Sequence, residues 1–151
     1  MSNDSLPRFQ NSLEQFEIHF GYIQKAKDVA EKFSPEVVAR VVGGHEQRLQ
    51  ELAFDLMPLV IELESEAGSN QSSIQQIEQR KEAAKITLEE LELRHLIGDL
   101  DEAAHAEASA PHQKTVEEAE AEVVPHQTQI AALQDALSRW ESLGAQSGLL
   151  Q

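Results

Sequence analysis

The chain has 151 residues, of which 40% are hydrophobic but only 5% aromatic, and its 27 acidic and 12 basic residues give a formal net charge of −15. A field of that sign repels nucleic acid and anionic membrane surfaces, because both bind through basic footprints. We therefore expect neither as a partner. The absence of cysteine excludes disulfides, thiolate zinc sites and cysteine nucleophiles.

The length is typical of one domain, so we expect a single helical domain over residues 1–151. The first ten residues are polar and lack the apolar segment of a signal peptide. No run approaches the ~18 apolar residues that a membrane span requires. These features predict a cytoplasmic protein.

Heptad spacing is the main structural signal. It predicts a first helix over 7–32, with Pro7 in its first turn, and a second over 35–66, with Ser34 as N-cap and Pro35 at the first position. The second helix contains Pro58, so we expect it to bend there, with a break as the alternative. Apolar steps of four and three residues run through both, at Phe9, Leu13, Phe16, Phe20, Ile23, Val38, Val42, Leu49, Leu52, Leu56, Leu59 and Leu63.

Residues 67–72 read Ala-Gly-Ser-Asn-Gln-Ser, a composition typical of a loop. A third helix is predicted over 72–97, ending before Gly98. A fourth is predicted over 101–143, with breaks or kinks at Pro111 and Pro125, and 144–151 is expected to be a flexible tail. Short connections force neighbouring helices to run antiparallel. The pattern therefore predicts an all-α fold: an elongated antiparallel bundle, or coiled-coil hairpins, of three to four long helices.

Histidines are the main candidates for chemistry. Two Glu-x-x-His pairs, Glu92–His95 and Glu102–His105, each place a carboxylate and an imidazole on one helix face. With a turn centred near Ser69, His45 would lie within a turn of His95. One hypothesis is therefore a metal site formed by His45, Glu92, His95, Glu102 and His105. Alternatively, the seam histidines fix the helix register or act as a pH-sensitive switch.

Apolar residues beside the main seam of the second helix predict a second face that must be buried. They are Val37, Val41, Ala53, Val60 and Ile61. Trp140 closes the last seam, where we expect it to be an anchor in the core or at a dimer interface. Catalytic motifs are absent from the sequence, so we expect neither an enzyme nor a cofactor. The predicted function is a coiled-coil interaction or scaffold module that self-assembles or binds a partner protein. The alternatives are a metal-binding bundle and an acidic chaperone or secretion-type hairpin for a basic client.

Overall fold

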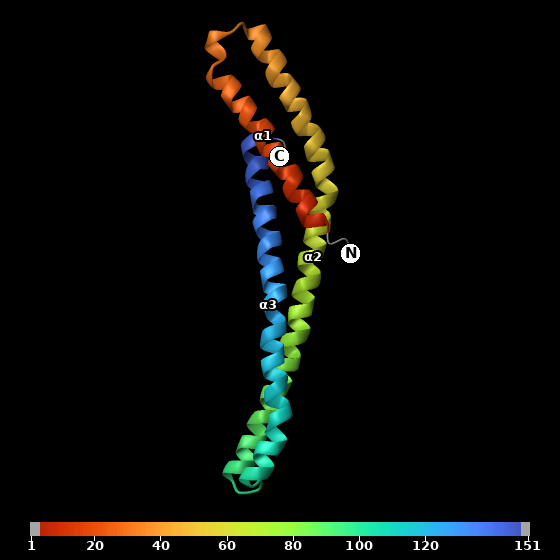
Figure 1. Cartoon of the computed structure of the whole chain (residues 1–151), viewed down its shortest axis with the longest axis vertical. Coiled ribbons are helices and arrows are strands. Elements are labelled where there is room, and N and C mark those ends of the chain that lie inside the picture. The colour runs from red at the N-terminus through yellow and green to blue at the C-terminus, as the bar shows by residue number, and fades with distance from the viewer. Residues whose placement is uncertain (1–3, 149–151) are drawn as a thin grey trace. The chain divides into compact units, whose positions relative to one another are not determined.

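The computed structural model describes residues 4–148 and, within that range, contains only helices and their connections. The elements are α1 (Ser5–Asp28), the short 3-10 helix η1 (Ala30–Lys32), α2 (Pro35–Leu96) and α3 (Glu102–Ser147), as Figure 1 shows. The all-α prediction is confirmed. None of the described helices is both long and apolar enough to cross a membrane.

The chain, predicted as one domain, divides into two compact units. The first contains α1, η1, the part of α2 up to Glu66 and the part of α3 from Ala132 onward. The second is residues 67–131. Because α2 and α3 each contribute to both units, every unit has its own set of helix–helix contacts.

The first unit is a bundle of three helical segments. Ser5, at the beginning of α1, donates a hydrogen bond to Glu62, whereas His19, further along α1, contacts His45. These pairs show that α1 and α2 run antiparallel. Phe16 packs edge-on against Trp140, with ring centroids 5.3 Å apart, and Phe20 lies near Gln146 in one pocket. The end of α3 therefore runs parallel to α1.

Most of the predicted heptad positions supply the core of the first unit, whereas Phe20 and Val38 are half-buried. Burying each large aliphatic or aromatic side chain contributes about 1.5–3 kcal/mol, so these rows account for the association of the three segments. The buried side chains are Phe9, Leu13, Phe16, Ile23, Val42, Leu49, Leu52, Leu56, Leu59, Leu63, Leu133, Ala136 and Trp140.

The second unit is an antiparallel hairpin of α2 and α3. An ion pair joins Arg80 to Glu122, and another joins Glu92 to His105 nearer the turn, so the two helices run in opposite directions. Few of its residues are buried, and most of those have small side chains. They are Ile77, Ala84, Ser109, Ala119 and Val123.

The turn of this hairpin forms as its sequence predicted. Gly98 has a φ of +84°, which glycine adopts without the cost that a Cβ would impose. Its N–H donates to the His95 carbonyl at 3.1 Å and the Asp99 N–H donates to the Arg94 carbonyl at 2.9 Å, which closes the end of α2. The Asp101 carboxylate then accepts the Ala104 N–H at 2.8 Å and caps α3.

The predicted loop at 67–72 is wrong, because α2 continues through it from Pro35 to Leu96. Glycine costs a helix about 1 kcal/mol relative to alanine, which is less than the gain from contacts on both sides. Glu66 is buried, and Asn70 bonds to His126 of α3 at 2.7 Å. Packing against a second helix thus outweighs the local preference for a turn.

The helices continue through the three prolines, as the prediction of a bent second helix required, so only the alternative of a break is wrong. Pro58 lies inside α2, and Pro111 and Pro125 lie inside α3. All three are exposed, so water can satisfy the carbonyl groups that lose their helical partner.

The predicted ends of the chain need two smaller corrections. The α-helical part of the first segment ends at Asp28, before the 3-10 turn, and α3 continues to Ser147 instead of fraying from 144. Residues 149–151 of the predicted tail lie outside the described residues.

Candidate functional site

An exposed apolar surface surrounds the connection between α1 and α2. Its side chains line a pocket of about 150 Å³. Phe33 is 57% exposed, and Val37 and Val41 are 49% and 48% exposed. We call the six lining residues the turn surface: Ala26, Val29, Phe33, Val37, Val38 and Val41.

Local structure explains why these side chains gather. Phe33 is extended, with φ −131° and ψ 164°, because the 3-10 turn ends there and α2 has yet to begin. The Ser34 hydroxyl accepts the Val37 N–H at 3.4 Å, as an N-cap does. Residues three and four positions apart share a helix face, so Val37, Val38 and Val41 lie together on the first turns of α2.

The segment that carries the turn surface is slightly basic, although the whole chain is acidic. Residues 25–41 contain four of the 12 basic residues, Lys25, Lys27, Lys32 and Arg40, against three acidic ones, Asp28, Glu31 and Glu36. Arg40 pairs with Glu36 at 3.2 Å, and the three lysines are exposed. The rest of the chain carries the negative charge.

A second exposed apolar surface lies at the end of the second unit. Leu93, Leu96 and Ile97 form it, and we call it the hairpin-end surface. Leu96 is 73% and Ile97 69% exposed. In the same segment, Arg94 bonds to Asp99 at 2.8 Å and to Glu90 at 3.4 Å. These two carboxylates raise the pKa of Arg94 above its usual value, first through the hydrogen bonds and then through their charges.

Other predicted interaction residues are placed differently. Ile61 is exposed, whereas Ala53 and Val60 are half-buried. Trp140 is a core residue of the first unit and not a surface anchor, because only 3% of it is exposed. Its ring fills the space between α1 and α3 and meets the edge of Phe16.

The five predicted metal ligands do not all converge. His45 belongs to the first unit, where its Nδ1 lies 3.0 Å from Nδ1 of His19. It was placed near His95 on the assumption of a turn near Ser69, and α2 has no turn there. His19 was not among the predicted site residues. In an antiparallel pair, residues at equal distances from the connection near residue 32 lie opposite each other, and this rule would have placed His19 opposite His45.

Three of the predicted ligands do meet in the second unit. The rings of His95 and His105 stack with centroids 4.7 Å apart and an interplanar angle of 19°. Glu92 lies 3.2 Å from Nε2 of His105, and Nδ1 of His95 lies 3.1 Å from the Leu100 carbonyl oxygen. Glu102 is exposed at the beginning of α3. Across residues 4–148, no group of three or more such side chains is arranged to hold a metal ion.

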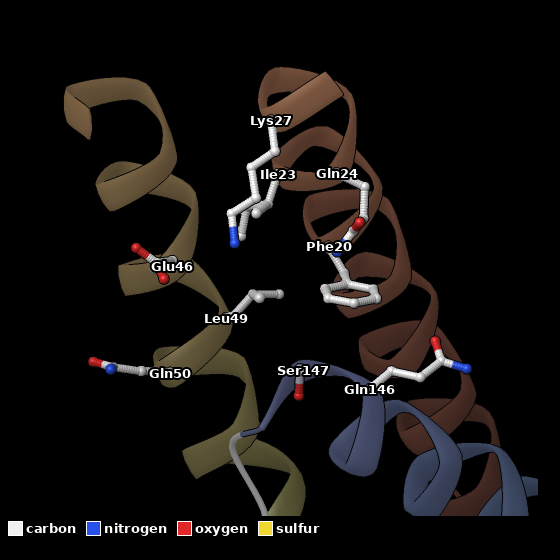
Figure 2. A pocket seen from close by; sticks show the side chains of 9 residues that line it. All are labelled: Phe20, Ile23, Gln24, Lys27, Glu46, Leu49, Gln50, Gln146 and Ser147. Carbon is white, nitrogen blue, oxygen red and sulfur yellow. The ribbon is translucent and has the colours of Figure 1, made fainter. Parts of the chain in front are cut away.

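A cavity of about 240 Å³ lies where the described end of α3 meets α1 and α2 (Figure 2). Lys27 extends from α1 toward the α2 segment that carries Glu46 (Figure 2). Amide and hydroxyl side chains contribute much of the remaining polar lining, which gives hydrogen-bonding capacity without a nucleophile and base in contact. The lining residues are Phe20, Ile23, Gln24, Lys27, Glu46, Leu49, Gln50, Gln146 and Ser147.

Comparisons of the chain with protein-family models, with curated proteins and with solved structures find no significant match.

Proposed function

We propose that this protein is a non-enzymatic helical interaction module that binds another protein chain through the turn surface. The observation that carries the proposal is the pocket lined by six apolar side chains, of which Phe33, Val37 and Val41 are about half exposed. Leaving such side chains in water forgoes part of the ~1.5–3 kcal/mol that burying each would contribute. Grouped exposure of this kind marks interaction sites in soluble proteins.

The basic residues of the segment that carries the turn surface favour a protein partner of opposite charge. Lys25 and Lys32 are exposed and directly precede two lining residues of the turn surface, Ala26 and Phe33, and interfaces combine an apolar centre with a polar rim. The net charge of −15 opposes binding of nucleic acid or an anionic membrane. We expect the module to act in the cytoplasm.

The two alternative functions have less support. A metal-binding bundle would need His45 beside Glu92 and His95, and His45 instead contacts His19. An acidic hairpin for a basic client would use carboxylates of the second unit, such as Glu122, which is paired with Arg80.

Native assembly size tests the proposal. Val41→Ser removes an apolar side chain from the turn surface, and Val124→Ser is its matched control, because Val124 is also helical and 56% exposed but lies in the second unit. In extract of the native host, we expect the tagged wild-type chain and the control to elute in an assembly larger than one chain. Val41→Ser should shift toward the size of one chain. If the wild type, Val41→Ser and Val124→Ser all eluted at the same size, the proposal would be contradicted.

A further inference from the structure

We propose that the partner at the turn surface is a second copy of this chain, which docks by its hairpin-end surface. This inference rests on the proposed function and names the occupant of the same site. It joins two apolar surfaces that are exposed in the part of the chain that the structure describes, one at the beginning of α2 and the other at its end.

The apolar parts match in size. The turn pocket measures about 150 Å³, and a cavity of roughly that volume accommodates a benzene molecule. It therefore has room for one leucine or isoleucine side chain. Leu96 and Ile97 are the most exposed members of the hairpin-end surface, so either can enter a pocket without first leaving a core.

The charges around the two surfaces are opposite. Residues 89–102 carry one basic residue, Arg94, and six acidic ones: Glu89, Glu90, Glu92, Asp99, Asp101 and Glu102. Arg94 is already bound to Glu90 and Asp99. Exposed Lys25 and Lys32 adjoin lining residues of the turn surface in the sequence, and complementary charge steers and orients association. Two hairpin ends brought together would instead repel.

This contact is heterologous, since each copy uses two different surfaces. One contact leaves a free turn surface on one copy and a free hairpin-end surface on the other, so assembly continues into a ring or an open filament. The surfaces contain few residues, and interfaces below ~1,000 Å² are weak or transient. Association should therefore increase gradually with protein concentration.

Mixing two variants of the full chain tests this geometry. Val41→Glu places a negative charge in the turn surface and keeps the hairpin end intact, whereas Leu96→Glu does the reverse. Val124→Glu and Ile86→Glu are controls at exposed helical positions outside both surfaces. Circular dichroism checks that all four remain helical, and sedimentation velocity measures the average mass over a concentration series.

We expect the wild type and both controls to gain mass with concentration beyond that of two chains. Val41→Glu and Leu96→Glu should each remain at one chain when alone, and an equimolar mixture should form a dimer and nothing larger. A mixture that behaves as two separate monomers would overturn the head-to-tail contact, and so would a wild type that stays at one chain up to ~1 mM, the millimolar limit of weak affinity. In the latter case, a large native assembly lost in Val41→Ser would identify a foreign partner, so the proposed function would survive.

Discussion

The Nδ1 atoms of His19 and His45 lie 3.0 Å apart, one on α1 and the other on α2. A hydrogen bond between two imidazole nitrogens needs one donor and one acceptor, so at least one ring must be neutral. Tyr22 covers the pair, with its ring centroid 5.9 Å from that of His19 and 5.2 Å from that of His45. Burial, then the neighbouring His45, and then Arg48 lower the pKa of His19 below its usual 6.5.

This contact predicts a loss of stability in mild acid. The unfolded chain binds a proton at His19 near pH 6.5, whereas the folded chain binds it only at lower pH. The contribution to stability is therefore fully present above pH 6.5 and is lost as pH falls toward the folded pKa. We expect urea unfolding to give a lower free energy of unfolding at pH 5.5 than at pH 7.5. Ordinary carboxylates titrate at about pH 4, which is below this range.

Two variants separate His19 from the other histidines. His19→Asn should reduce the difference between the two pH values, and His112→Asn in the second unit should leave it unchanged. An equal pH dependence in wild type and His19→Asn would show that the His19–His45 contact does not control it.

Gly68→Ala tests the continuity of α2. A Cβ at Gly68 would meet nothing within 4 Å, and alanine is about 1 kcal/mol more favourable than glycine inside a helix. We expect the substitution to raise the free energy of unfolding by up to about that amount. Gly98→Ala is the control of opposite sign, because Gly98 has a φ of +84°, where a Cβ costs about 1–2 kcal/mol. Destabilisation by Gly68→Ala would indicate that the helix is interrupted at residue 68.

Trp140→Ala tests the assignment of Trp140 to the core. Its ring is buried and packs against Phe16, so truncation should lower the free energy of unfolding by about 3–5 kcal/mol. Phe54→Ala removes an aromatic side chain that is largely exposed and should change it by less than about 0.5 kcal/mol. Denaturant melts of the two variants make the comparison. Similar, small effects would place Trp140 on the surface.

Metal removal tests the remaining histidine cluster. Glu92, His95 and His105 touch in pairs, and we expect dialysis against EDTA to leave the thermal midpoint of the wild type unchanged. A metal that binds only the folded state would stabilise it by RT ln(1 + [M]/Kd), where [M] is the free metal concentration and Kd is the dissociation constant. If EDTA lowered the midpoint of the wild type but not that of His95→Ala, a metal site at this cluster would be established.

The sequence predicted what depends on residues close together in the chain. The seam from Val42 to Leu63, the start of α2 at Pro35 and the end at Gly98 follow from side-chain spacing and backbone preference. The predicted loop at 67–72 was wrong because its contacts come from the other helix. Asn70 bonds to His126 of the other helix, and local composition carries no information about that pairing.

The candidate site was predicted in part for the same reason. Val37 and Val41 were expected to form an extra apolar face, and both are exposed. Val29 and Phe33 were not, because the connection between α1 and α2 has no periodicity to mark which side chains face outward. His45 was placed in the wrong cluster, because a turn assumed at Ser69 pairs the residues before it with those after it, and the continuous helix α2 allows no such pairing.

The most direct test of an interaction function places a photo-reactive group in the turn surface. The substitution Phe33→p-benzoylphenylalanine puts the group in the turn pocket, and Phe54→p-benzoylphenylalanine puts it at an exposed position outside that pocket. After irradiation in the native host, we expect position 33 to yield a discrete cross-linked protein product and position 54 to yield none of that product. Absence of any product from position 33, or the same product from both positions, would contradict binding through the turn surface.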